Sequence, residues 1–183
     1  MRILMTITIF AVVAGCQTVR NGYYADVKMS NGALFSGNVR NDIFHGQGTI
    51  TYNAPHKEAG YKFVGEFKDG TPYGIITETY SSPHEKAGLK YVGEIKNNLR
   101  DGQGTITSSL PHEDAGYKYV GEVGGGKIQG IGTETYSLPH EQAGEKYVGK
   151  FKDNERDGHG THSISLPHKM AGAKYVGEFS EGK

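Results

Sequence analysis

Apolar and polar residues alternate in short runs along the chain, and turn-forming residues follow each run. In residues 90–95, Tyr91, Gly93 and Ile95 share one face of an extended strand, because successive side chains point to opposite faces. Residues 102–107 likewise place two glycines and an isoleucine on one face and polar side chains on the other. The turn-rich residues 96–101 between these runs predict a β-hairpin. Glycine normally weakens a strand, so its regular placement predicts an aromatic ring lying flat over bare backbone.

This hairpin pattern returns every 28 residues with no insertion, so the chain is a repeat array. The strand glycines that mark the period are Gly37, Gly65, Gly93, Gly121, Gly149 and Gly177. Pro-His and Ala-Gly pairs in the linkers keep the same spacing. A weaker period of 56 residues is also present, since residues 47–51 return at 103–107 and residues 77–81 return at 133–137. It indicates duplication of a two-repeat block.

The linkers between hairpins predict either a short helical turn or a plain loop. In residues 81–88, Ser82 suits a helix N-cap, Pro83 the first helical position and Gly88 a left-handed stop. The other copies have Ala or Leu at the cap position, so the plain loop remains an alternative. Before the array, Ser30-Asn31-Gly32 separates two strand-like runs, residues 24–29 and 33–39. Asn-Gly between such runs predicts a hairpin that caps the N-terminal end of the array.

Composition narrows the class of protein. The chain has 183 residues, of which 28 are glycine, and its hydrophobic content of 36% is low for a two-layer core. Its 12 Tyr and 7 Phe supply apolar bulk that disordered chains lack. The net charge of zero argues against nucleic-acid binding, which needs a basic surface. The single Cys excludes an internal disulfide framework and a Cys-rich zinc site.

The first residues predict a secretory signal. Met1-Arg2 precedes an apolar run, residues 3–14, which is shorter than the roughly 20 residues that a membrane-spanning helix needs. Val13-Ala14-Gly15-Cys16 then resembles a bacterial lipobox, and an ordinary secretory signal with an unrelated Cys is the alternative. The resemblance implies cleavage before Cys16 and lipidation of its sulfur and new amino group, and Gln17 resembles the sorting signal for the outer membrane. The expected organisation is a signal peptide over residues 1–15, a lipidated Cys16 with a short tether over 16–22, and a repeat domain over 23–183.

The repeat unit resembles the MORN repeat. Phe63-Val64-Gly65-Glu66-Phe67, a turn and then Tyr73-Gly74 follow the family pattern of an aromatic residue, any residue, Gly, any residue, an aromatic residue, a turn and Gly-x-Gly. The pattern occurs five times between residues 35 and 183, with a sixth half copy at 175–179. The resemblance implies an all-β fold, an elongated single-layer antiparallel sheet of stacked hairpins. The chain departs from the family at Ile76, which replaces the second Gly of one copy, and where the frequent Trp is replaced by Val39, Phe67, Ile95, Val123, Phe151 and Phe179.

Histidines do not point to a metal site. Five of them form a ladder in the Pro-His loops, namely His56, His84, His112, His140 and His168. With two strands per repeat at about 4.8 Å, equivalent histidines stand roughly 10 Å apart, too far to share a zinc ion. We expect each to hydrogen-bond its own turn or pack on the next loop, with a binding surface as the alternative. The other three histidines, His45, His159 and His162, lie near predicted turns and are expected at the surface.

No pattern indicates an enzyme, a metal or another cofactor. Gly124-Gly125-Gly126-Lys127 lacks the spacing of a phosphate-binding loop and falls on a predicted hairpin turn. The chain has no Gly-x-Ser-x-Gly elbow. The glutamates that recur in the first strands are expected to form a solvated row rather than a catalytic pair; they are Glu66, Glu94, Glu122 and Glu178.

A row of aromatic residues remains as a candidate binding surface, with packing against the strand glycines as its structural alternative. It consists of Phe63, Tyr91, Tyr119, Tyr147 and Tyr175. As a functional surface it would stack on glycan, lipid or peptide.

These features predict a non-catalytic lipoprotein that is anchored to the outer membrane of a bacterial envelope and acts as a repeat scaffold for protein partners. The alternative is a module that binds phospholipid or cell-wall glycan. Residues 174–179 form a terminal strand with no expected partner within the chain, and an exposed edge favours pairing with a second copy. A chain truncated within a repeat is the other explanation of that strand. The sequence does not identify the protein partner.

Overall fold

The computed structural model describes residues 20–182. The predicted signal peptide, Cys16 and Gln17 lie outside these residues. The described part of the chain forms twelve β-strands and contains no helix. The strands are β1 (Gly22–Lys28), β2 (Leu34–Arg40), β3 (Ile43–Thr51), β4 (Tyr61–Lys68), β5 (Thr71–Tyr80), β6 (Leu89–Lys96), β7 (Leu99–Ser108), β8 (Tyr117–Gly124), β9 (Lys127–Tyr136), β10 (Glu145–Lys152), β11 (Glu155–Ile164) and β12 (Lys174–Phe179).

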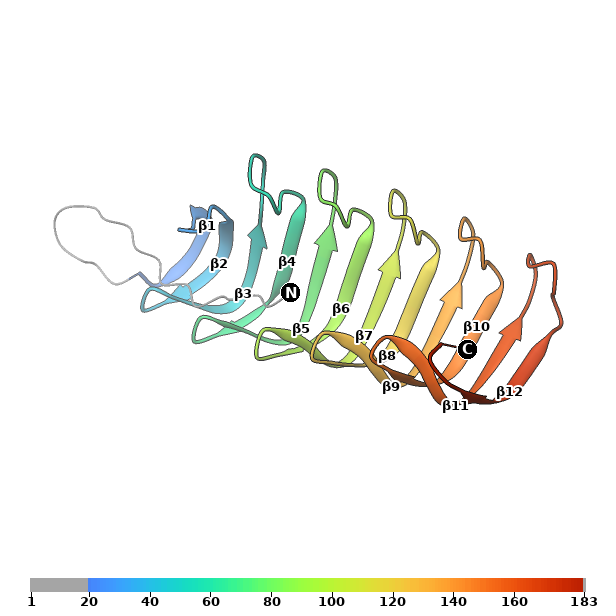
Figure 1. Cartoon of the computed structure of the whole chain (residues 1–183). Helices are drawn as coiled ribbons and strands as arrows, with labels where there is room; N and C mark the ends of the chain where they lie inside the picture. The colour runs from blue at the N-terminus through green and yellow to red at the C-terminus, as the bar shows by residue number, and fades with distance from the viewer. Residues whose placement is uncertain (1–19, 183) are drawn as a thin grey trace.

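All twelve strands belong to one antiparallel sheet, in which each strand pairs with its neighbours in sequence (Figure 1). The predicted all-β, single-layer sheet of stacked hairpins is therefore confirmed. The N-terminal hairpin is confirmed as well, since β1 pairs with β2 across a turn in which Asn31 Oδ1 accepts a hydrogen bond from the Ala33 amide at 3.1 Å. The prediction that the terminal strand, β12, has no partner within the chain is wrong, because one of its edges pairs with β11.

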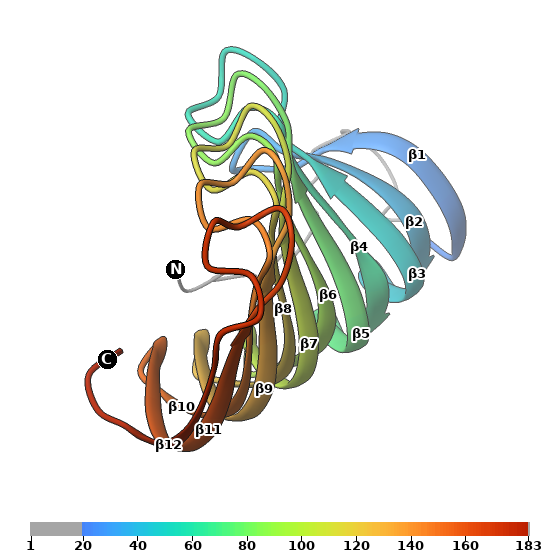
Figure 2. The same cartoon turned by 90° about the vertical axis from the view of Figure 1, so that its right-hand side faces the viewer.

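The sheet is curved into a trough, which is visible along its length in Figure 2. Each repeat hairpin shifts register next to its strand glycine, for example between Gly93 and Ile95 of β6, where β7 carries two additional residues. At this bulge the first Gly of the Gly-x-Gly pattern, Gly102 in β7, has a φ of 118°, which favours glycine. Bulges bend a strand and increase its twist. Their repetition in every hairpin gives the sheet a concave and a convex face.

The hairpin turns are shorter than the sequence pattern predicted. The predicted turn over residues 96–101 is wrong in extent, because β6 continues to Lys96 and β7 begins at Leu99. The turn consists of Asn97 and Asn98, whose φ angles of 51° and 59° are typical of a two-residue type I′ turn. The remaining predicted turn residues belong to the start of β7 and its bulge.

The predicted helical turn in the Pro-His loops is also wrong. In residues 81–88 the amides of His84 and Ala87 donate to the carbonyls three residues before them, which gives two successive turns instead of a helix. Each loop also bonds to the next one, since the Ser109 amide donates to the Gly88 carbonyl at 2.9 Å. A Cβ at Gly88 would overlap the Ser109 carbonyl oxygen. The Ala-Gly glycine therefore permits the loops to stack along one side of the sheet, as Figure 1 shows.

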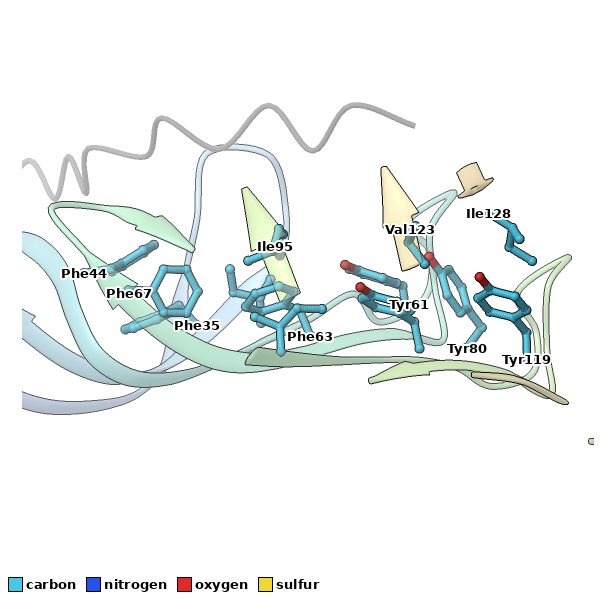
Figure 3. Packing of buried hydrophobic residues seen from close by; sticks show 14 of the residues in the cluster. Phe35, Phe44, Tyr61, Phe63, Phe67, Tyr80, Ile95, Tyr119, Val123 and Ile128 are labelled. Carbon is cyan, nitrogen blue, oxygen red and sulfur yellow. The ribbon is translucent and has the colours of Figure 1, made fainter. Parts of the chain in front are cut away.

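The apolar core lies on the concave face and continues from hairpin to hairpin (Figure 3). At its N-terminal end the rings of Phe35 and Phe44 stack with centroids 3.7 Å apart, and Phe67 packs edge-on against both. The residues at the frequent Trp positions of the repeat are all buried in this core; they are Val39, Phe67, Ile95, Val123, Phe151 and Phe179. A single-layer sheet thus obtains a core by curling around its own side chains.

The 56-residue period is preserved in the structure. Strands β4 to β7 and strands β8 to β11 have the same lengths and the same spacing along the chain. We refer to residues 61–116 as the first block and to residues 117–172 as the second block. Residues 56 positions apart in the two blocks occupy equivalent places in the sheet.

Candidate binding site on the concave face

The aromatic row packs against glycine backbone. A Cβ at Gly104 would stand 2.5 Å from Cε2 of Tyr91, and a Cβ at Gly93 would stand 2.5 Å from its hydroxyl oxygen. At each of the six strand glycines an added Cβ would lie within 2.7 Å of another heavy atom. The Tyr91 hydroxyl reaches past the glycines and donates to the Glu94 carbonyl at 2.8 Å, and Tyr119 bonds the Glu122 carbonyl in the same way. The predicted stacking of rings over glycine is confirmed.

The aromatic row does not form an open surface, which corrects the functional interpretation of four of its members. Phe63, Tyr91, Tyr119 and Tyr147 are 0% exposed. Only Tyr175, in the terminal strand, is 53% exposed. These rings are core residues because both strands of a hairpin curve around them.

Between the rings, the concave face carries polar side chains that the sequence analysis did not single out. Glu78 of β5 accepts hydrogen bonds from the Tyr61 hydroxyl at 2.7 Å and from Nε of Arg100 at 2.6 Å. Arg100 also lies over the Tyr91 ring, with its guanidinium carbon 4.6 Å from the ring centroid. We call Tyr61, Glu78, Tyr80 and Arg100 the first polar cluster. The sequence alternation could have revealed this cluster, since Glu78 falls on the face of its strand that is otherwise apolar.

The second block has an equivalent cluster, which consists of Tyr117, Glu134, Tyr136 and Arg156. Glu134 accepts from Nε of Arg156 at 2.8 Å, and Nη2 of the same guanidinium lies 2.7 Å from the carboxylate. Arg156 covers the Tyr147 ring at 5.0 Å. The two clusters lie 56 residues apart, so they alternate with apolar repeats along the trough.

Burial raises the pKa of tyrosine hydroxyls in and next to these clusters. Burial, together with the charge of Glu78, raises the pKa of Tyr80 to about 12, although Arg100 opposes the shift. Burial, the charge of Glu78 and the hydrogen bond to it raise the pKa of Tyr61 further. Burial raises the pKa of Tyr91 and of Tyr119 to about 12. These hydroxyls therefore stay protonated, and can donate hydrogen bonds, to a higher pH than an exposed tyrosine does.

A small cavity opens beside the first polar cluster. Its volume is about 150 Å³, and its polar lining consists of Glu78, Tyr80, Lys86, Asn98 and Arg100. Lys86 comes from a Pro-His loop and Asn98 from a hairpin turn, so the cavity lies where the two sides of the trough approach each other. The Asn98 side chain contributes a buried Oδ1 that has no hydrogen-bond partner among the described residues.

The five loop histidines form hydrogen bonds within their own loops, as predicted. Nδ1 of each ring accepts a hydrogen bond from the backbone amide two residues later, as in the bond from Lys86 to His84 at 3.0 Å. His84 is buried against Tyr80, and its Nε2 lies 3.1 Å from Glu58 of the preceding loop. A binding surface formed by the exposed parts of this ladder stays a prediction.

His162 lies elsewhere than predicted. It belongs to β11 and occupies the concave face, where its Nε2 lies 2.9 Å from Glu145 Oε2. His168 approaches the other oxygen of Glu145 at 3.8 Å. Within residues 20–182, no group of three or more His, Cys, Asp or Glu side chains has a geometry that could hold a metal ion. The same residues include no helix of the length and apolarity required to span a membrane.

The recurring glutamates of the first strands are exposed on the convex face, as predicted, and so lie apart from the polar clusters. Residues 124–127 form a hairpin turn between β8 and β9, also as predicted. Neither group contributes an acid-base pair to the concave face.

Comparison with known proteins agrees with this architecture. The sequence model of the MORN repeat matches residues 35–53, 91–109, 119–137 and 147–163. Each matched segment corresponds to one hairpin of the sheet, and the hairpin β4–β5, which contains Ile76, lies between two of them. No curated protein matches the chain. The repeated hairpins, their Gly-x-Gly pattern and the four matched segments show that the chain belongs to the MORN repeat family.

Proposed function

We propose that this protein is a non-catalytic, lipid-anchored scaffold of the bacterial envelope, whose sheet binds protein partners. MORN repeats suggest a repeat scaffold for binding, and the open convex face is the observation that supports protein binding most directly. Aliphatic side chains on this face are exposed at intervals along the sheet, including Ile75 at 70% and Ile131 at 53%. A rigid repeat surface of this kind builds affinity from contacts spread over many repeats.

The non-catalytic part of the proposal rests on how the ionisable groups are used. The buried carboxylates Glu78 and Glu134 are each paired with an arginine, and the loop histidines bond to their own turns. Groups held in this way are occupied in structural contacts. A catalytic acid or base needs access to a substrate atom within hydrogen-bond reach.

The anchor is proposed from the lipobox-like Val13-Ala14-Gly15-Cys16. Two or more acyl chains anchor a protein stably, since each buried methylene contributes about 0.8 kcal/mol. Incorporation of radiolabelled palmitate in a bacterial host tests this part of the proposal. The label should be present in the wild type and lost in Cys16→Ser. Equal labelling of both proteins would contradict the anchor at Cys16.

Protein binding is tested by capture from envelope extracts with the non-acylated mature chain, which begins at residue 17, as bait. The double variant Ile75→Lys/Ile131→Lys places charges on the convex face and should abolish specific capture. Leu138→Lys is the matched control, because Leu138 is 72% exposed but lies in a Pro-His loop. Capture that the double variant leaves unchanged would count against the convex face as the binding surface.

Sedimentation separates the scaffold from a phospholipid- or glycan-binding module. The non-acylated mature chain, which begins at residue 17, is spun with purified peptidoglycan and, separately, with liposomes that contain anionic lipid. The scaffold predicts that the protein stays in the supernatant in both cases. Since basic residues contribute about 1 kcal/mol each to binding of an anionic surface, a chain with 20 basic and 20 acidic residues is expected to bind such liposomes weakly.

Self-association through β12 is part of the same proposal. Within residues 20–182, β12 pairs with β11 alone, and Tyr175 and Val176 are exposed. An open strand edge favours antiparallel pairing with a second copy. Light scattering of the non-acylated mature chain should detect dimers at high concentration, and a strict monomer would refute this part.

A further inference from the structure

We propose that the convex face of the sheet binds a second copy of this chain. This inference rests on the proposed function, because it names one protein partner of that face. Pairing of two faces is separate from pairing at the β12 edge, since it uses side chains of the sheet surface rather than open backbone groups. Its support comes from three rows of side chains that cross the strands on the convex face.

The middle row is an unbroken line of β-branched residues over ten strands, from β3 to β12. Each member is the Cα partner of the next, so neighbouring members stand about 4.8 Å apart. The row consists of Thr49, Val64, Thr77, Val92, Thr105, Val120, Thr133, Val148, Thr161 and Val176. It carries no charge and its side chains are short, so another surface can approach closely along it.

Charged rows flank the middle row on both sides. Two residues before each valine stands a lysine, and two residues after it stands a glutamate in all repeats but one, so the flanking rows lie about 13 Å apart along the strands. The lysine row consists of Lys62, Lys90, Lys118, Lys146 and Lys174. The glutamate row consists of Glu66, Glu94, Glu122 and Glu178, with Lys150 in the remaining place. All these side chains are exposed.

The lysines of this face are free to pair with another chain, whereas the glutamates are held in position. Within residues 20–182, the ammonium group of Lys127 alone forms an ion pair or a side-chain hydrogen bond, and Lys127 lies outside the lysine row. One oxygen of Glu94 accepts from the Gln103 amide at 3.0 Å, and one oxygen of Glu122 accepts from the Ile131 amide at 3.3 Å. The second oxygen of each carboxylate is left for a donor from a partner. Side chains that are already ordered lose less freedom on binding.

The order of the rows makes the face complementary to itself in one orientation. A twofold axis along the middle row reverses the flanking rows, so the lysine of one copy faces the glutamate of the same strand in the other copy, as with Lys90 and Glu94. A twofold axis along the strands keeps the row order, so lysine faces lysine. Repulsion between like charges disfavours the second arrangement. The first arrangement is isologous and closes as a dimer.

The shape of the face agrees with this arrangement. Two convex faces approach most closely along the middle row, and the longer lysine and glutamate side chains span the gap that widens on both sides. At about 4.8 Å per strand the three rows cover roughly 600 Å² per copy, less than the roughly 800 Å² per partner of a standard interface. We therefore expect a weak dimer. Both arrays then run in the same direction, which anchoring of both copies at Cys16 in one membrane requires.

Analytical ultracentrifugation of the non-acylated mature chain, which begins at residue 17, measures this association at low salt. Lys150→Glu completes the glutamate row and should tighten the dimer at least threefold, because two repulsive contacts between the copies become attractive. General charge repulsion predicts the opposite, since the variant gives a nearly neutral chain a negative charge. Lys152→Glu is the matched control. It makes the same charge change on the same strand and face but outside the three rows, and it should not tighten the dimer.

The lysine row is tested by its loss. Lys90→Glu/Lys118→Glu should weaken the dimer at least tenfold, and salt at about 0.5 M should weaken the wild-type dimer as well. Association that neither this double variant nor Lys150→Glu changes would overturn the proposal and favour the β12 edge. Monomers at every concentration in both the wild type and Lys150→Glu would also overturn it.

Disulfide cross-linking tests the orientation. The single Cys of the chain is Cys16, so the mature chain from residue 17 has none. With the axis along the middle row, Val120→Cys and Val148→Cys should each form cross-linked dimers, although the two positions lie in different repeats. Leu138→Cys is the control, because Leu138 is 72% exposed, compared with 40% for Val148, but lies in a Pro-His loop. Faster cross-linking at Leu138 than at both valines would contradict face-to-face pairing.

The measurements separate this inference from the scaffold function. If the mature chain captures envelope proteins but stays monomeric, the dimer fails and the scaffold stands. If association depends on the charged rows as expected but no other protein is captured, the dimer stands and the scaffold for other partners fails.

Discussion

The first and second blocks have the same strands but different interiors, and the difference shows which residues act together. In the second block, Tyr119 lies over Gly132 and Gly121, and its hydroxyl bonds the Glu122 carbonyl. In the first block, Phe63 takes the place of Tyr119 and Ile76 takes the place of Gly132. The Ile76 side chain fills the space above Gly65. Phe63 and Tyr119 are both 0% exposed. In these two blocks the ring without a hydroxyl accompanies the larger aliphatic residue, although in the β2–β3 hairpin Phe35 packs over Gly48. We predict that within the two blocks ring and glycine act as a unit.

The blocks also differ in one backbone donor. Ile128 donates its amide to Asn154, whereas Pro72 has none to offer to Asn98. Because proline replaces isoleucine at this position, the turn asparagine of the first block has no hydrogen-bond donor. Structural repetition can therefore be complete at the level of strands while hydrogen bonding and packing differ at individual positions. The following predictions test this comparison, from the largest expected effect to the smallest.

The largest effect should come from placing the residue of the first block into the second. In Gly132→Ile, the new side chain would overlap the Tyr119 ring. We expect the free energy of unfolding to fall by about 3 kcal/mol, because overpacking a filled core forces side chains and backbone apart. Urea denaturation measures the change.

The double variant Tyr119→Phe/Gly132→Ile recreates the pair found in the first block. It should recover at least about 1 kcal/mol relative to Gly132→Ile alone, which a double-mutant cycle detects. Additive effects of the two substitutions would show that ring and glycine do not act as a unit.

Removing the buried carboxylate of either polar cluster should have the next largest effect. Glu78→Ala leaves Arg100 without its ion partner, and Glu134→Ala does the same to Arg156. We expect each to cost about 2 kcal/mol, below the range for fully buried pairs, because both arginines retain some exposure. Glu85→Ala, in an exposed loop position, is the control and should change stability by less than about 0.5 kcal/mol. A cost no greater than that of the control would contradict the structural role of the pairs.

Alkaline pH should destabilise both blocks through their buried tyrosines. The pKa of Tyr91 in the first block and of Tyr119 in the second is about 12 in the folded chain, above the ordinary value of 10.0. Between pH 10 and 12 the unfolded chain loses these protons while the folded chain retains them, so stability falls as pH rises. The slope should be at most about 1.4 kcal/mol per pH unit for each tyrosine.

Denaturation at a series of pH values measures this slope. Tyr91→Phe and Tyr119→Phe should each reduce the slope above pH 10 by a similar amount. A slope that neither variant changes would mean that the stability loss arises from other groups.

The smallest effect should come from Pro72→Ile, which makes the turn of the first block like that of the second. The restored amide can donate to Asn98 Oδ1, which contributes about 1 kcal/mol. Part of this gain is lost because proline restricts the unfolded chain more than isoleucine does. We expect a net stabilisation of about 0.5 kcal/mol in urea denaturation. A clear destabilisation would show that Asn98 does not accept this donor.

Much of the architecture could be predicted from the sequence, because it depends on interactions between residues close in the chain that recur in every repeat. Alternation of side chains assigned Tyr91, Gly93 and Ile95 to one face, and the 28-residue spacing assigned every repeat the same hairpin. The low hydrophobic content agreed with a single layer. The bonding of the loop histidines to their own turns could also be predicted, since these contacts lie within a few residues of the chain.

Only the tertiary structure determined which of the repeated residues are buried and which line a cavity. The curvature of the sheet buried the aromatic row, and it depends on bulges at glycines such as Gly102, whose left-handed backbone is not visible in a strand pattern. The cavity depends on residues from four separate segments, which include Glu78, Lys86, Asn98 and Gly126 and meet because the trough brings loops and turns together. Sequence spacing determined which residues repeat, and three-dimensional packing determined which of them are buried, paired or left without a partner.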